Sequence, residues 1–428
     1  MKQLSRSRED YEIEVTKDVV RDFAIIRQGL DKKPESQGKE AVLETIKRIK
    51  LLQLDTINIV ERSHYLVLLS RIGSYEKEDL DSLFSRSALF EQRSHAACVI
   101  PIESYPFLRP EIINRRNLPI KRIKMKQLGE DPDAVFDRVL SKIKAEGPVS
   151  SKDFADDKRS ERKGWWDRKP ERVALEILWK RGYLAVERKA NFQCYYNLTE
   201  RVIPQKFLKT EYTLENFRKW AAINALDAQG IATVLDINDY YRQNLRETAT
   251  MLDNLIKDGI VVKVKVDGWK EDAYVLSKDL NAIEELRNNS SKLSATTLLS
   301  PFDNLIWYRE RMERLFGLHF RIEMYTPKEE RSGGYYSMPI LHKNRIVGTA
   351  DPKVDRKNGI MVINSLSLMD GVEQDENLVL GLSGAITKVA KFTGCESIRV
   401  IETMPHKLKS RLEQEFKASA QTKVKVKA

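Results

Sequence analysis

The sequence predicts an α+β fold, and two observations support that class. Three helical segments followed by two strand-like runs occur between residues 134 and 204, and the same order recurs between residues 217 and 276. After about residue 293 the helical pattern gives way to short strands broken by Gly, Pro and Asn. Three short helices and a two-stranded wing are the elements of a winged helix. We therefore predict tandem winged-helix domains, followed by a small β-barrel-like C-terminal domain.

The N-terminal region shows a less regular version of the same pattern, which we interpret as a third winged helix. Apolar residues at helical spacing predict helices over about 17–27, from about residue 41, and over about 77–84. An apolar strand-like run then follows His95. A lone histidine at such a place is more often a structural hydrogen-bonding group than a functional one, and both roles stay open.

The two clear repeats align where the third helix of each meets its wing. LWKRGYLAVER in the first repeat aligns with LIKDGIVVKVK in the second. In the first repeat, Ser150 or Ser151 can cap a short helix, Pro170 opens the next one, and Gly182 ends it in the left-handed conformation. The second repeat contains an Asp267-Gly268 hairpin turn between its strands.

The C-terminal segments read as alternating strands, with a helix rich in arginine before them. We expect strands within FRIEMYT, GGYYSMPIL, RIVGTADPKVD and GIMVINSLSL, then a final helix and strand, and a disordered tail TKVKVKA. We predict five parts. Residues 1–130 form an N-terminal winged-helix-like domain that carries the Gln-Leu-Asp motif, and residues 131–210 and 211–292 form one winged helix each. Residues 293–415 form the barrel-like domain, and residues 416–428 form a basic tail.

The composition points to an anionic partner in a reducing compartment. Lys and Arg number 74 against 63 Asp and Glu, which leaves a net charge of +11 spread along the chain. Nucleic acid is the default partner of such a surface, although a basic soluble protein is the alternative. Three distant cysteines argue against disulfides and against a cysteine-based metal site. The polar start MKQLSRSREDYE and the absence of a membrane-length apolar run predict a cytoplasmic protein without membrane contact.

The stretch LLQLDTINIVERSHYLVLLSRIGSY, residues 51–75, crowds polar groups between apolar runs. In an extended segment, the spacing of Gln53 and Asp55 places both side chains on one face while Leu54 anchors the other. A carboxylate and an amide that face one small volume can hold and activate a water molecule. The alternative is that Asp55 or Asn58 caps a helix and Gln53 is a solvated turn residue.

Polar and basic side chains near that motif and in the wings are candidate DNA contacts. They are Asn58, Arg62, Ser63, His64, Arg71, His95, Arg188, Lys189, Lys263, Lys265 and Lys353. Phosphate contacts explain the basic positions in the wings, and so does a solvated face. The basic loop DKRSERKGWWDRK contains Trp165 and Trp166, which form either an aromatic platform for nucleic acid or an apolar plug between domains.

The central stretch also resembles a known family. QLD at residues 53–55, followed by TIN and SHY, resembles the catalytic Gln-apolar-Asp motif of the AlkZ/YcaQ-like family, the winged-helix DNA glycosylases that remove alkylated purines and unhook interstrand cross-links. LLSPFDNLIW, RLFGLHFRIEMYTP, GYYSMPIL and GTADPKVDR resemble the family's C-terminal domain. Two positions depart from the pattern: Ala96 follows His95 where we expect an acidic residue, and Thr349 stands where we expect Arg.

This resemblance implies three winged helices and a β-barrel in a C shape around double-stranded DNA that carries alkylated bases or cross-links. It also implies a nucleoid-associated monomer without metal or organic cofactor. Alkylation at N7 makes guanine a cationic leaving group, so one carboxylate and one water-positioning group suffice. Asp55 would stabilise the developing positive charge and accept a proton from water, while Gln53 orients that water. The alternative function is a tandem winged-helix transcriptional regulator without catalysis.

Overall fold

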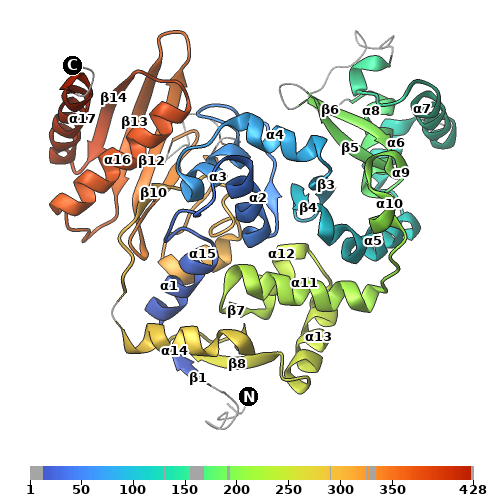
Figure 1. Cartoon of the computed structure of the whole chain (residues 1–428), viewed down its shortest axis with the longest axis horizontal. Helices are drawn as coiled ribbons and strands as arrows, with labels where there is room; N and C mark the ends of the chain where they lie inside the picture. The colour runs from blue at the N-terminus through green and yellow to red at the C-terminus, as the bar shows by residue number, and fades with distance from the viewer. Residues whose placement is uncertain are drawn as a thin grey trace. The chain divides into compact units, whose positions relative to one another are not determined.

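The computed structural model in Figure 1 describes residues 13–129, 131–154, 168–189, 193–289, 291–323, 326 and 334–425. The chain divides into two compact units, and both ends of the chain belong to the same one. Unit 1 combines Met1–Tyr75 with Ala222–Ala428, and unit 2 is Glu76–Ala221. The five-part division of the sequence stays a prediction.

The N-terminal part of unit 1 supplies three helices and the short strand that carries Gln53. These elements are α1 (Lys17–Arg27), α2 (Gly38–Ile49), β2 (Leu52–Gln53) and α3 (Ser63–Ile72), with β1 (Ile13–Val15) ahead of them. Helix α1 has the predicted bounds, and it begins where the Thr16 side chain accepts a hydrogen bond from the Val19 amide. Its apolar face, including Phe23, joins the core that also contains Ile306 and Leu341 from the C-terminal part.

The middle of the chain follows the order that the second sequence repeat predicts. Helix α11 (Leu214–Gln229) leads from unit 2 into unit 1, and the elements after it are β7 (Ala232–Thr233), α12 (Val234–Tyr241), α13 (Leu245–Lys257), β8 (Val261–Val266), β9 (Ala273–Leu276) and α14 (Leu280–Asn288). Thr233 and Asp236 form a capping box at the start of α12, and Asn244 caps α13. The strands form a sheet in the order β1-β8-β9-β7.

The C-terminal part of unit 1 corrects the prediction of a barrel-like domain. Five strands form an open mixed sheet in the order β10-β11-β12-β13-β14, which has two edges in the described residues. They are β10 (Thr296–Leu298), β11 (Met338–His342), β12 (Arg345–Asp355), β13 (Ile360–Leu368) and β14 (Ser397–Met404). The sheet stays open because α16 (Glu376–Phe392) connects β13 to β14 as a parallel pair, and it leaves β14 at an edge (Figure 1).

Two further expectations for this region differ from the structure. Residues 320–323, at the start of the predicted strand FRIEMYT, are not in a strand, and they follow α15 (Arg309–Phe316) without pairing in the described sheet. A last helix that the sequence did not suggest, α17 (Lys407–Lys425), includes the first residues of the tail predicted to be disordered. It packs against α16 and β14. Packing against the sheet stabilises this helix, and sequence periodicity carries no information about such packing.

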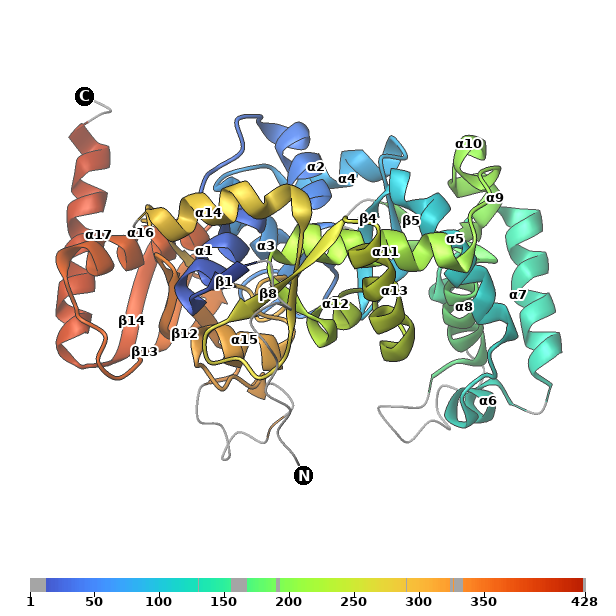
Figure 2. The ribbon, with the colours of Figure 1, turned by 90° about the horizontal axis from the view of Figure 1, so that it is seen from below.

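Unit 2 begins with α4 (Lys77–Ser85) and the antiparallel pair of β3 (Leu89–Arg93) and β4 (Ala97–Pro101). The other elements are α5 (Tyr105–Asn114), α6 (Arg122–Leu128), α7 (Pro132–Glu146), α8 (Pro170–Lys180), β5 (Leu184–Lys189), β6 (Gln193–Leu198), α9 (Thr199–Val202) and α10 (Gln205–Leu208). Figure 2 shows α7 and α8 next to each other, and they share an apolar core.

The first sequence repeat is reproduced closely in unit 2. Helix α8 starts at Pro170, and Gly182 after it has a φ of 69°. Ser150 forms a capping box with Asp153 around a short 3₁₀ turn. Trp165 and Trp166 lie outside the described residues, so the two interpretations of their loop stay predictions.

Candidate active site

The predicted catalytic pair lies at the end of β2 and in the segment that follows, residues 54–62, which we call the motif loop. Gln53 is the last residue of β2 and is buried, whereas Asp55 is partly exposed. The Asp55 Oδ1 atom accepts a hydrogen bond from the Ile57 amide at 2.8 Å, which closes a tight Asx turn. Neither Asp55 nor Asn58 caps a helix, because α3 begins at Ser63. The capping alternative is therefore replaced by a local turn at Asp55.

Strand β12 holds the motif loop in place from the C-terminal part of unit 1. The Val354 amide donates to the Ile59 carbonyl at 3.0 Å. The Arg356 guanidinium donates to the Asn58 Oδ1 atom at 2.7 Å and to the Val60 carbonyl at 2.8 Å. One hydrogen bond from β12 and two from Arg356, the residue directly after that strand, thus join this segment to the middle of the loop, and they restrict the backbone that carries Asp55.

A second group of contacts lies beneath the loop around Tyr336. The Ser63 and Ser300 hydroxyls are 2.8 Å apart. The backbone amide of Tyr336, which is fully buried, donates to Asp351 Oδ1 at 2.9 Å. Burial raises the pKa of the Tyr336 phenol and the nearby carboxylates of Asp55 and Glu61 raise it further, while Ser300 lowers it. Ser300 is therefore close to the phenol oxygen, but no hydrogen bond of good geometry reaches that atom within the described residues.

The charge of Asp55 is not balanced by a cation. Burial raises the pKa of its carboxyl group, and the Ile57 and Thr56 amides oppose that shift. No Lys or Arg of the described residues lies within ion-pair distance of it. Two fully buried carboxylates of unit 1 differ: Asp303 is paired with Arg71 and Asp236 with Arg311. Asp55 is thus a partly buried base with an uncompensated negative charge.

Several predicted DNA contacts beside the motif are buried, which changes their assignment. The Arg71 guanidinium donates to both carboxylate oxygens of Asp303, at 2.7 and 2.9 Å, and to the Gln28 carbonyl at 2.8 Å. A guanidinium enclosed in this way cannot reach a phosphate, so we reassign Arg71 to a structural role. Ser63 and His64 are also buried, with His64 against the Tyr65 ring.

Asn58 and Arg62 remain at the surface of the motif loop, where Asn58 is exposed and Arg62 is partly exposed. Lys353 is exposed on β12, close to the loop segment that Val354 contacts. Lys263 and Lys265 lie on β8, where Lys265 pairs with Glu14 at 3.0 Å and Lys263 lies 3.9 Å from Asp272. These five residues keep the exposure that a DNA contact requires.

The predicted contacts in unit 2 have different environments. His95 lies in the turn between β3 and β4, with its Nδ1 atom 4.0 Å from the Cys98 sulfur. Arg188 is paired with Glu91, a buried carboxylate. Removing the guanidinium would leave that carboxylate unpaired, so we reassign Arg188 to a structural role. The side chain of Lys189 lies outside the described atoms.

Three residues near the motif loop were not predicted from the sequence: Ser300, Tyr336 and Arg356. Each is far from Asp55 in sequence, and none belongs to a motif with a role of its own. The only available signal was their position in or beside segments that resemble the family's C-terminal domain. The sequence alone did not indicate that those segments contact the QLD motif in the folded protein.

The described residues contain no group of three His, Cys, Asp or Glu side chains arranged to hold a metal ion. None of the described helices combines the length and apolar character that crossing a membrane requires.

Comparison with known proteins identifies the family. The family model for DNA glycosylase AlkZ-like proteins matches residues 46–390, which include the motif loop and its partners on β12 and around Tyr336. The chain belongs to the AlkZ-like DNA glycosylase family. The resemblance seen in the sequence is confirmed, and the general function of this AlkZ-like protein is that of a DNA glycosylase.

A solved structure agrees with the fold of this AlkZ-like protein. It is similar to the Streptomyces sahachiroi DNA glycosylase AlkZ, with a TM-score of 0.62 and 16% sequence identity. The match covers 91% of this chain and 100% of that chain. At this identity the similarity concerns the fold alone, and the lesion and the catalytic residues must be argued from the site.

Proposed function

We propose that this protein hydrolyses the N-glycosidic bond of N7-alkylated purines in double-stranded DNA and unhooks interstrand cross-links, as a monofunctional glycosylase. In this proposal Asp55 activates the attacking water and Gln53 positions it. Membership of a DNA glycosylase family supports DNA as the substrate. The lesion and the mechanism are inferred from the chemistry of the motif loop.

The observation that carries the proposal is the uncompensated carboxylate of Asp55. A carboxylate already paired with arginine, as Asp303 is with Arg71, has its charge neutralised. Asp55 instead has a raised pKa and no cation partner among the described residues. Such a group suits a substrate that brings its own positive charge, because the electrostatic gain appears only when the substrate is bound.

The reaction can be written with few groups. An N7-alkylated guanine is cationic and leaves without protonation, so the sugar develops oxocarbenium character. The Asp55 carboxylate stabilises that charge and accepts a proton from the attacking water, and its raised pKa makes it a stronger base. We include Tyr336 as a positioning residue. Its buried phenol lies near Asp55 and has a hydroxyl available to a water molecule or to the carboxylate.

The position of Asp55 near the surface fits the proposed action on cross-links. A base tied to the opposite strand cannot swing fully into a deep pocket, unlike the bases that other glycosylases flip out of the helix. Asp55 is partly exposed, and its neighbours Thr56 and Asn58 are exposed. A carboxylate on such a loop can approach a base that leaves the duplex only slightly.

We also propose that winged helices hold the DNA, with the protein acting as a monomer. The elements from α11 to β9, and those from α7 to β6, have the helix and strand order of that fold. Lys263 and Lys265 lie on β8, the first strand of a wing, and Lys353, Asn58 and Arg62 surround the motif loop. Contacts of this kind to phosphates position the duplex without reading its sequence.

The test is a single-turnover assay on a duplex that contains one N7-methylguanine. We expect release of the base and an intact abasic strand, with no adduct trapped by borohydride, because water and not lysine is the proposed nucleophile. A transcriptional regulator would bind a preferred sequence and leave the damaged base in place. A second duplex with an N7-linked cross-link tests unhooking separately.

A further inference from the structure

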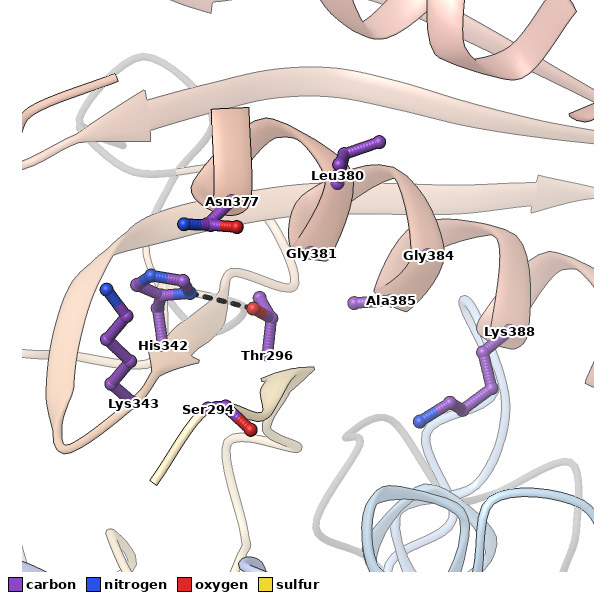
Figure 3. Close-up of a pocket in the computed structure, with 10 residues that line it drawn as sticks. All are labelled: Ser294, Thr296, His342, Lys343, Asn377, Leu380, Gly381, Gly384, Ala385 and Lys388. Atoms are coloured by element: carbon purple, nitrogen blue, oxygen red, sulfur yellow. Dashed lines mark hydrogen bonds between the residues drawn. The ribbon is translucent and has the colours of Figure 1, made fainter. Parts of the chain in front are cut away.

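A cavity of about 490 Å³ lies between α16 and the β10–β11 side of the C-terminal sheet, and its lining includes no residue of the motif loop (Figure 3). Figure 3 shows Lys343 at one end of it and Lys388 at the other. Its lining residues are Ser294, Thr296, His342, Lys343, Asn377, Leu380, Gly381, Gly384, Ala385 and Lys388. Two of them are lysines and none is acidic. The volume lies within the range of small-ligand sites.

The two lysines of this cavity form no ion pair with a carboxylate in the part of the chain that the structure describes. Lys388 is partly buried, and its pKa is lowered first by burial and then by the charge of Lys33. Among the described residues, no carboxylate forms an ion pair with Lys388, Lys343 or Lys33. Lys50, a partly buried lysine elsewhere in unit 1, has Asp227 at 2.7 Å. A partly buried cation without such a partner favours an anion beside it.

The remaining polar groups suit an oxygen anion. The His342 ring bonds to the Thr296 hydroxyl through Nδ1 at 2.8 Å; burial and Lys343 lower the pKa of the ring, while the nearby Asp375 carboxylate raises it. Ser294 and Asn377 present a hydroxyl and an amide at the exposed rim. Hydroxyl, amide and ammonium groups are donors that phosphate oxygens accept.

Two glycines of α16 line the cavity and keep its wall free of side chains. A Cβ atom at Gly381 would lie 2.1 Å from the Thr296 Oγ1 atom, so packing within the protein requires that glycine. A Cβ atom at Gly384 would meet no atom within 4 Å. Glycine is less favourable than alanine inside a helix, and packing of the described residues gives no reason for it at 384. Gly384 is exposed, and without a side chain it leaves this stretch of the helix open to close approach by a ligand.

We propose that this cavity binds a phosphate compound whose anionic groups meet Lys388 at one end and Lys343 at the other, with Ser294 and Asn377 as hydrogen-bond donors. The compound is either a DNA strand or a free phosphate compound, and the chemistry of recognition is the same. This site is separate from the motif loop, and it does not depend on the proposed role of Asp55.

The test compares two lysines of the same helix in the full-length protein. Lys388→Gln removes the cavity charge, and Lys391→Gln removes the same charge from an exposed position of α16 that does not line the cavity. Calorimetric titration with inorganic phosphate and fluorescence anisotropy with undamaged duplex DNA are measured for both. We expect Lys388→Gln to weaken binding of at least one probe about tenfold and Lys391→Gln to change it less than twofold.

The two probes separate the sources of the phosphate. If the titration with inorganic phosphate weakens, the site accepts a free phosphate. If only DNA binding weakens, and the slope of log K against log salt becomes shallower by about 0.9, the site holds a backbone phosphate. Equal effects of the two variants would mean general attraction by charge and would overturn the proposal.

A cavity-filling variant supplies a test that does not change charge. Gly384→Leu places a side chain in the cavity without a clash at its Cβ atom, so the thermal midpoint should be unchanged or higher. We expect the same loss of binding as in Lys388→Gln. Wild-type affinity for both probes in Gly384→Leu would refute an occupied cavity, and a lowered midpoint would refute the argument from Gly384.

Discussion

Replacing Asp55 with Asn separates its chemical role from its structural one. The structural role is the Asx turn, in which Oδ1 accepts from the Ile57 amide at 2.8 Å, and an Asn side chain offers an equivalent oxygen. The change in unfolding free energy should therefore stay within about 0.5 kcal/mol. The negative charge and the proton acceptor are lost, and removal of a positioned general base typically lowers the rate about 10²- to 10⁴-fold. That loss corresponds to about 3 to 5 kcal/mol of activation free energy.

The assay is single-turnover release of N7-methylguanine with excess enzyme, together with thermal unfolding. Asp131→Asn is the matched control, because the Asp131 carboxylate likewise accepts a local backbone hydrogen bond, from Ala134 at 3.0 Å, and is far from the motif in sequence. It should cleave at the wild-type rate. A stable Asp55→Asn protein that releases the base at the wild-type rate would refute the role of Asp55. If Asp55→Asn were unfolded, Asp55→Glu would take its place, with partial activity expected.

Four further predictions test the surroundings of Asp55. Because burial raises its pKa above 3.8, the rate of base release should fall as pH falls through that raised pKa, and Asp55→Asn should abolish this limb of the pH-rate profile. Tyr336→Phe should slow base release about tenfold in the single-turnover assay without lowering the thermal midpoint, since no well-formed hydrogen bond reaches the phenol oxygen; a lowered midpoint would show a structural role. Arg356→Gln loses two hydrogen bonds to the motif loop and should lower kcat about tenfold with little change in KM, whereas Lys357→Gln, its exposed neighbour, should change neither. Arg71→Met should cost about 3–5 kcal/mol in chemical denaturation by leaving Asp303 buried and unpaired, and a stable variant with weakened DNA binding would contradict its structural role.

The local elements of the fold were largely predictable because their signals are local. Pro170 and Gly182 mark the two ends of α8, and hydrophobic spacing sets α1, so these elements follow from a few neighbouring residues. Whether the C-terminal sheet forms a closed barrel or an open sheet could not be predicted in the same way. Whether five strands close or stay open depends on the strand order, here on the crossover through α16, and strand patterns carry no information about partners.

The candidate site shows the same division between local and distant information. The spacing of Gln53 and Asp55 was visible in the sequence, whereas Arg356 and Tyr336 come from positions hundreds of residues away and reach the motif loop only through the fold. Charge alone was a poor guide to the DNA contacts. Arg71 looked like a phosphate ligand because its partner, Asp303, is 232 residues away and nothing in the sequence links the two.

The proposed role of Asp55 gives a reason why its carboxylate has no counter-ion in a strongly basic protein. Two arginines of unit 1 have partners other than Asp55: Arg71 is fixed by Asp303, and Arg356 donates hydrogen bonds to Asn58 and Val60. Arg356 stabilises the loop, and neither arginine forms an ion pair with Asp55. A cationic base about 4 Å from that carboxylate would gain about 4 kcal/mol at an effective dielectric constant of about 20, and a neutral base would gain none of it. In the proposed mechanism the same carboxylate would therefore serve both steps: it would favour a cationic lesion over undamaged DNA, and it would stabilise the positive charge that passes to the sugar as the bond breaks.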